Sequence, residues 1–354
     1  MNTQPVKQPV NIARKRWIAG DIQCNEALST VYVVRRTDNF RDDNYYWSIN
    51  DHRKELKVMA TTLAFHDSAH KQAYQLHVRL NHFNSMRLTP ALLRPEWQAN
   101  LHNEYVASVE EGLFVEHERH PVERTASDAP RQPAAFLSWF EELRESGSGQ
   151  NDPLFPWLGN VATLPEMRWF LAQEAVGEAG FDDLVALTQV RCPVRAKLEM
   201  ARNYWDEMGR GHERGMHGLM LGAVVRELEL KPSIDETVWE ALALSNLMAA
   251  LASNRRYAYQ SVGALGVIEM TAPGRVAHIN AGLKRLGAPM AARAYFQLHE
   301  GLDIQHSKSW NEEVIYSLVD ADARTAGPIA EGALMRLASG ARCFRRYRAH
   351  LGLL

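Results

Sequence analysis

The chain contains few cysteines, little net charge and no long apolar run, and each shortage excludes a class of protein. Its 354 residues include only 3 cysteines, Cys24, Cys192 and Cys343, whose scatter argues against a disulfide framework or a cysteine-based zinc site. The formal net charge of −2 gives no reason to expect nucleic acid or an anionic membrane as a partner. No apolar stretch reaches the length of a membrane span. We therefore expect a protein of the reducing cytoplasm.

Familiar nucleotide-binding and hydrolase signatures are missing as well. The sequence has no glycine-rich phosphate loop, no Gly-x-Ser-x-Gly turn and no strand–helix–strand rhythm, which argues against nucleotide-binding and serine-hydrolase folds. Its basic N-terminal stretch, residues 1–17, is not followed by the apolar segment of a secretory signal.

Apolar residues recur at intervals of three and four, the spacing of helices that bury one face. The pattern is interrupted at residues 120–134, a stretch rich in proline, serine and charge, and is strongest beyond it. The short β-branched run Ser29–Arg35 fits either a strand or a helix end. We predict an all-α fold, with a mostly helical accessory region at residues 1–135 and a helical domain at residues 136–354.

A ladder of two histidines and one aspartate is the most informative motif. His299, Asp303 and His306 occur at offsets of zero, four and seven in the segment Tyr295–Trp310. On an α-helix, where each residue turns by about 100°, these offsets place the three side chains within roughly 60° of one another. Imidazole and carboxylate groups on one stripe can form one wall of an iron, manganese or zinc site.

Three further residues can supply the opposite wall. Glu207 and His217 are separated by a segment that contains Gly209 and Gly211, and these glycines allow a kink that would turn both side chains toward one centre. Glu269 lies in an apolar run, where an ionised carboxylate is costly to bury without a cation. Together with the ladder, these residues match the ligand count of a carboxylate-bridged two-metal site in a helical bundle.

Simpler interpretations exist for each of these residues. Glu269 is also compatible with a structural ion pair to an arginine, and the histidines with hydrogen-bonded positions unrelated to metal. A second histidine series, His66, His70 and His77, has spacing that zinc could use. Its surroundings are polar, so we interpret it as a hydrated helix face.

The order of the six residues resembles a known family. The series Glu207, His217, Glu269 and then His299-x-x-x-Asp303-x-x-His306 is similar to the ligand order of the heme-oxygenase-like diiron oxidases and oxygenases, also described as iron-containing redox enzymes. The stretch at residues 151–174 resembles the opening of the wider heme-oxygenase-like superfamily, with Asp152 in place of that opening's histidine. The resemblance covers residues 150–310 well and the N-terminal third poorly.

The resemblance implies a heme-oxygenase-like helical bundle, two Fe²⁺ ions held by the six residues, and O2 as co-substrate. Some members use one more carboxylate from the first core helix, and Glu174 or Glu178 would supply it here, although either also fits a solvated helix position. Known members N-oxygenate amines or cleave C–C bonds in amino acids or fatty acids. We expect N-oxygenation of a small amine or amino-acid-derived metabolite, free or carrier-bound, with an electron donor and a homodimer.

Four alternatives remain open at this stage. The same site could cleave a C–C bond, or could use zinc or manganese for hydrolysis. A metal-free branch of the superfamily is a third possibility, although such branches lack this ligand set. The last is a non-enzymatic helical interaction protein, for which alanine at His299 or His306 would leave function intact.

Overall fold

The computed structural model describes residues 63–90, 94–177 and 180–353, and these residues form helices joined by short turns. Within them there is no strand, only an isolated bridge between Met208 and Met216. The all-α prediction is therefore confirmed, while the run Ser29–Arg35 lies outside the described residues. None of the described helices is both long and apolar enough to cross a lipid bilayer.

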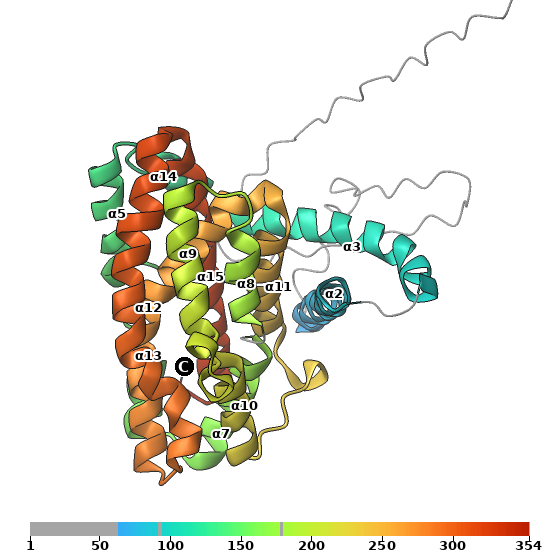
Figure 1. Cartoon of the computed structure of the whole chain (residues 1–354). Coiled ribbons are helices and arrows are strands. Elements are labelled where there is room, and N and C mark those ends of the chain that lie inside the picture. Colours follow the sequence, from blue (N-terminus) through green and yellow to red (C-terminus); the bar gives the residue numbers. More distant parts are fainter. Residues whose placement is uncertain (1–62, 91–93, 178–179, 354) are drawn as a thin grey trace, which may run out of the picture.

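The centre of the domain is a long buried helix with a partner on each of two sides. Helix α12 packs along α13 and along α15 (Figure 1). A Cβ atom added at Gly263 would lie 1.8 Å from the carbonyl oxygen of Ile329, and one added at Gly332 would lie 1.8 Å from that of Gln260. Glycine is therefore required at both positions for the backbones of α12 and α15 to touch. The bounds of these helices are Ala258–Arg285 for α12, Met290–Ser309 for α13 and Ala326–His350 for α15.

Further helices surround this centre and bury apolar side chains against it. Helix α11 is buried along most of its length, and a π-helical segment, Trp310–Ile315, links α13 to α14. The bounds are Pro133–Ser146 (α5), Leu154–Asn160 (α6), Leu164–Gly177 (α7), Phe181–Thr188 (α8), Val194–Glu207 (α9), His217–Glu227 (α10), Trp239–Ser253 (α11) and Tyr316–Ala321 (α14).

Helix α7 begins at a capping interaction between Thr163 and Glu166. The backbone nitrogen and hydroxyl of Thr163 both donate to Glu166 Oε2, each at 2.7 Å, so the carboxylate satisfies a backbone N–H that the first turn leaves free. Helix α7 ends at Gly177, and α8 starts after Gly180, whose φ of +86° is left-handed. Glycine adopts that conformation without steric cost.

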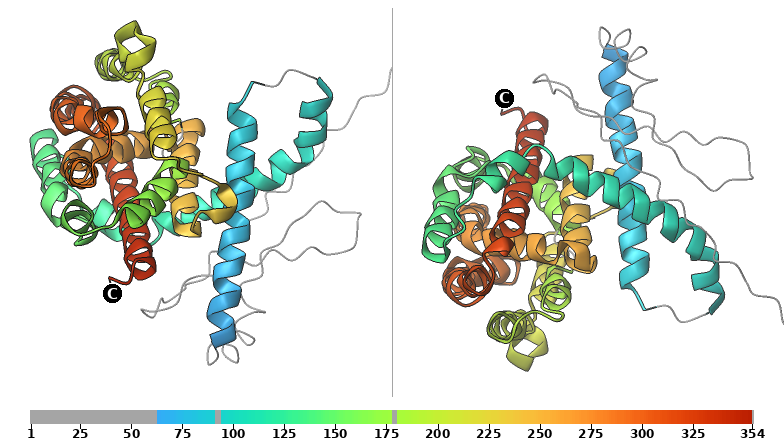
Figure 2. Two further views of the ribbon diagram at one scale, coloured as in Figure 1. Left: turned by 90° about the horizontal axis from the view of Figure 1, so that it is seen from below. Right: turned by 90° about the horizontal axis from the view of Figure 1, so that it is seen from above.

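Two N-terminal helices stand beside the bundle, as Figure 2 shows for α2 (Leu63–Leu88) and α3 (Arg94–Arg119). Helix α2 packs against α11, and there the buried Asn84 Nδ2 donates to Asn246 Oδ1 at 3.0 Å. The division at residue 135 stays a prediction. The accessory helices nevertheless contact the bundle through buried polar and apolar groups.

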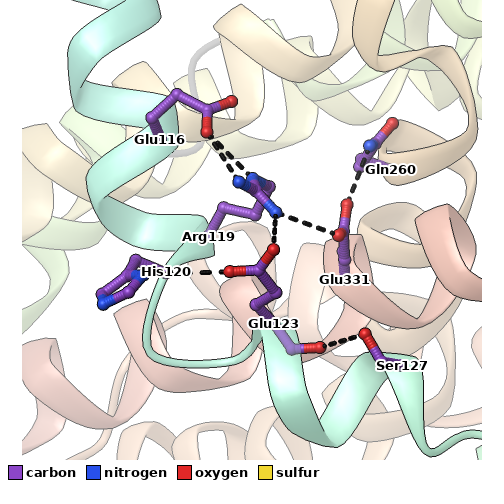
Figure 3. A network of polar contacts seen from close by, with 7 residues as sticks. All are labelled: Glu116, Arg119, His120, Glu123, Ser127, Gln260 and Glu331. Atoms are coloured by element: carbon purple, nitrogen blue, oxygen red, sulfur yellow. Dashed lines mark hydrogen bonds and ion pairs between the residues drawn. The ribbon is translucent and has the colours of Figure 1, made fainter. Parts of the chain in front are cut away.

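A polar network around Arg119 fastens α3 and the short helix α4 (Glu123–Ser127) to the bundle (Figure 3). The guanidinium group of Arg119 forms ion pairs with Glu116, Glu123 and Glu331. Glu331 on α15 also accepts a hydrogen bond from the side chain of Gln260 on α12, at 3.0 Å. Residues 120–134, where the helical pattern of the sequence is interrupted, thus include a short helix that ion pairs connect to the bundle.

Candidate metal centre

The predicted ladder lies on α13 as expected. His299, Asp303 and His306 are 8%, 4% and 5% exposed, and all three belong to the buried face of the helix. This face is turned toward α10 and α12, against which α13 packs. The three side chains therefore share one buried face of α13, as their spacing predicts.

Glu207 and His217 come together through a break between two helices. Glu207 is the last residue of α9 and His217 is the first residue of α10, and His217 Nδ1 lies 2.6 Å from Glu207 Oε2. Two 3-10 turns, Gly209–Gly211 and Glu213–Gly215, fill the interval. The sequence suggested a kinked helix, whereas the chain ends one helix, makes a compact loop and begins another.

Glycine is required within this loop. Gly209 has a φ of +60°, and a Cβ atom placed on it would lie 2.4 Å from the carbonyl carbon of Gly215. Gly211 also has a left-handed φ of +83°. Larger residues at these positions would push the two turns apart. Glu207 and His217 would then also separate, because the packed turns hold them close together.

Glu269 projects from α12 into the same centre. It is 3% exposed, its Oε1 accepts a hydrogen bond from Asn203 Nδ2 at 2.7 Å, and its Oε2 lies 3.5 Å from His306 Nδ1. The alternative of an ion pair with an arginine is not seen for Glu269 among the described residues. Its neighbours are an amide and an imidazole.

The structure forms two groups of potential ligands that share one residue. Glu207, His217 and His299 make one group, and Glu207, Glu269 and His306 make the other, with the ligand atoms of each group within 4.8 Å of one another. Asp303 belongs to neither group. It lines the same cavity of about 410 Å3 as Glu207, His217, Glu269 and His299.

Two histidines of the centre have one ring nitrogen occupied. The Nδ1–H of His299 donates to the backbone oxygen of Tyr295 at 2.7 Å, because a carbonyl oxygen can only accept. The Nε2–H of His306 donates to Asp206 Oδ2 at 3.1 Å. These bonds leave His299 Nε2 and His306 Nδ1 as the free nitrogens, a pattern that fixes the ring orientation of metal-binding histidines.

Asp206 and Asn203 were not among the predicted site residues. Asp206 also forms an ion pair with Arg210 at 2.5 Å, and Asn203 lies one helical turn before Glu207 on α9. Only this one-turn spacing could have identified Asn203 in the sequence. The exposed His212 and Glu213 take no part, as expected.

Burial sets the protonation of the centre. Burial, and then the neighbouring His217, lower the pKa of His299 to about 4, so its ring is neutral at pH 7. Burial also lowers the pKa of His306, but Glu269 and Asp206 outweigh it and raise that pKa to about 9. Burial raises the pKa of Glu207, against the opposing effect of His217. A cation in the centre would replace the protons that these groups share.

The donor set fits a transition metal. Within the described part of the chain, the buried Nδ1 atoms of His217 and His306 have no hydrogen-bond partner, although each lies within 4 Å of a carboxylate oxygen. Close approach without hydrogen-bond geometry is the arrangement of groups that converge on a metal ion. Imidazole nitrogens with carboxylate oxygens suit iron, manganese or zinc.

Of the two candidates for an additional carboxylate ligand, the structure describes Glu174 only. Glu174 on α7 lines the 410 Å3 cavity and accepts a hydrogen bond from the hydroxyl of Tyr347 at 2.9 Å, and it is in neither ligand group. Glu178 lies outside the described residues.

The second histidine series is partly exposed and partly buried. His77 is 3% exposed, stacks on Trp239 with ring centroids 5.7 Å apart, and meets Phe114 edge-on at 4.8 Å. His70 is exposed and accepts a hydrogen bond from Trp239 Nε1 at 2.9 Å. The side chain of His66 is not among those that the structure describes. The hydrated interpretation is therefore wrong for His77, because α11 covers it.

Comparison with known proteins agrees with the arrangement of the centre. Residues 168–341 match the family described as iron-containing redox enzyme, and this range contains all six predicted site residues. No curated protein shows a significant match to the chain.

Solved structures with low overall similarity were also found. One is a domain of unknown function with a heme oxygenase-like fold from Shewanella denitrificans OS217, with 13% identity, a TM-score of 0.46, and coverage of 61% of this chain and 90% of that chain. Another is a CADD-like protein of unknown function from Nostoc punctiforme PCC 73102, with 12% identity, a TM-score of 0.45, and coverage of 68% and 98%. Residues 168–341, which include most of the helical domain, are therefore similar to the iron-containing redox enzyme family.

Proposed function

We propose that the protein is a non-heme diiron oxidoreductase that activates O2 and oxidises a small amine or amino-acid-derived metabolite, with N-oxygenation favoured. The observation that carries the proposal is the position of Glu207 in both ligand groups. A carboxylate shared by two groups of three ligands is the arrangement expected for a bridged pair of metal ions.

In this proposal the six residues divide into two halves around Glu207. His217 and His299 hold one ion, Glu269 and His306 hold the other, and Asp303 completes the set from the wall of the cavity. Iron held there would supply the redox chemistry between O2 and the amine, and an external electron donor would be needed for repeated turnover.

The remaining side chains orient the ligands and exclude water. Asn203 fixes the carboxylate of Glu269, and Tyr295 and Asp206 fix the rings of His299 and His306. The rest of the 410 Å3 cavity is mostly apolar, lined by residues such as Leu221, Val225, Val276, Ile279 and Phe296. An apolar wall limits side reactions with water and leaves space for a small organic substrate.

The test begins with metal content. Protein prepared without metal is loaded anaerobically with Fe²⁺, and the iron bound per chain is measured, followed by O2 consumption with a panel of primary amines. We expect about two iron ions per chain and amine-dependent O2 uptake that forms an N-oxygenated product. Preferential binding of zinc, with no O2 uptake, would favour the hydrolase alternative, and loss of CO2 or of another carbon fragment would favour C–C cleavage.

A further inference from the structure

A second cavity adjoins the metal centre. It has a volume of about 490 Å3 and lies between α2, α7, α11 and α15. Five residues line both this cavity and the one that contains the ligand groups: Glu174, Ala175, Gly180, Pro232 and Ile268. The first cavity is also lined by Glu207, His217 and Glu269, so the shared wall separates the second cavity from the metal centre. The two cavities together have the size of a site for a small organic molecule.

Arg336 lines the second cavity and is 7% exposed. Among the described residues it has no ion-pair partner within 4.0 Å and no hydrogen bond, and its Nε is buried without a partner. Two other arginines of α15 are different, since Arg342 pairs with Glu118 at 2.8 Å and Arg348 pairs with Asp152 at 2.7 Å. A largely buried guanidinium group without an anion is unfavourable, because burial removes part of its hydration and no protein anion compensates for the loss.

We propose that Arg336 binds the carboxylate of a small amino carboxylate, and that the amino group of this ligand extends past Glu174 to the metal centre. The proposal names the substrate class of the function proposed above and rests on it. A guanidinium group recognises a carboxylate through two parallel hydrogen bonds, which fixes the direction of the ligand as well as its position.

Polar groups along the path fit the amino part of such a ligand. The carboxylates of Glu174 and Asp183 line the second cavity, and Glu174 also faces the metal cavity. Asn84 Oδ1 is buried in the described structure without a hydrogen-bond partner and can accept an N–H. The lining of the second cavity therefore offers one cationic group for a carboxylate and several oxygen atoms that can accept from an amine.

This assignment gives the accessory region a role in the site. Asn81, Asn84 and Ser85 of α2 line the second cavity, so the N-terminal helix forms part of the wall that would enclose the ligand. Removal of α2 would therefore remove part of the wall of this cavity.

The test measures binding to the metal-free full-length protein by calorimetry. The probes are straight-chain ω-amino carboxylates of four to eight carbons, the alkylamines and alkyl carboxylates of equal length, and inorganic phosphate. We expect the wild type to bind at least one amino carboxylate, with more than tenfold weaker binding of the amine that lacks the carboxylate. Arg336→Gln should weaken binding of the amino carboxylate by more than tenfold and leave binding of the amine unchanged.

Controls separate binding from folding. Arg345 lies on the exposed side of α15, so Arg345→Gln removes the same charge from the same helix and should leave binding unchanged. Arg336→Lys keeps the charge without the planar fork and should bind with intermediate affinity. Arg336→Gln should unfold at the same temperature as the wild type or higher, because it removes a buried charge that has no partner. A lower unfolding temperature would indicate a structural role and count against the proposal.

The remaining outcomes are equally decisive. Failure of every amino carboxylate to bind the wild type, equal binding to Arg336→Gln, or phosphate binding tighter than carboxylate binding would each overturn the assignment. Because binding is measured without metal, its result is independent of the iron measurement. Absence of iron together with Arg336-dependent binding would reject the diiron function and keep the subsite.

Discussion

Asn203 and Glu269 join α9 to α12 directly at the candidate metal centre. The amide Nδ2 of Asn203 donates to Glu269 Oε1 at 2.7 Å, and both side chains are buried. Asn203 thereby leaves Glu269 Oε2 facing His306. The contact fixes which oxygen of the carboxylate is available to a metal ion.

Replacing Asn203 by alanine should weaken iron binding without removing a ligand. We expect the affinity for Fe²⁺ to fall about tenfold or more, because Glu269 loses the donor that orients it. The measurement is an anaerobic Fe²⁺ titration. Arg202→Ala changes the adjacent, exposed side chain of α9 and is the control. Equal iron affinity of the Asn203 variant and the wild type would show that the hydrogen bond does not position Glu269.

The shared position of Glu207 predicts unequal losses of iron. Glu207→Ala should reduce bound iron to near zero, because both ligand groups contain this residue. His217→Ala should leave about one ion per chain, since the group of Glu207, Glu269 and His306 remains complete. Elemental analysis of the two proteins decides the matter. Equal stoichiometry in both variants would contradict a bridging role for Glu207.

The loop between α9 and α10 predicts a contrast between two glycines. Gly209→Ala introduces a Cβ 2.4 Å from the backbone of Gly215 at a left-handed φ, so it should lower both stability and iron content. Gly301→Ala is the matched control on α13, where a Cβ meets nothing within 4 Å. There the helix should gain up to about 1 kcal/mol. Thermal unfolding and iron analysis of both variants test this difference. Normal iron binding by Gly209→Ala would contradict the prediction.

The sequence was sufficient for those parts of the site that depend on helical periodicity. His299, Asp303 and His306 lie on one buried face because their spacing alone fixes their relative direction. The spacing of Glu207 and His217 carries no such information, since a loop of two tight turns lies between them. Asn203 and Asp206 were missed for a related reason. Their roles depend on which helices pack against α9, and packing is a property of the whole fold.

In the fold, too, features set by local sequence were predictable and features set by long-range packing were not. Helix starts that depend on local chemistry, such as the Thr163–Glu166 capping interaction, follow from the sequence. His77 was expected on a hydrated face because its neighbours along the chain are polar. It is buried because Trp239, 162 positions further on, stacks against it, and no local pattern contains that contact.

Burial of His77 predicts a stability change with pH. Burial, and then Arg342 and Arg79, lower its pKa in the folded state to about 3, against an ordinary value of 6.5. Between these values the unfolded chain takes up a proton and the folded chain does not, so stability is complete above pH 6.5 and is lost as pH falls. At pH 5 the loss from this residue should be about 2 kcal/mol.

The change His77→Phe keeps an aromatic ring between Trp239 and Phe114 and removes the titration. The free energy of unfolding, measured with urea at pH 8 and at pH 5, should differ less between the two pH values for this variant than for the wild type. His212→Phe, at an exposed position, should retain the full difference. An unchanged difference in the His77 variant would mean that other groups, such as buried carboxylates, govern the acid sensitivity of the fold.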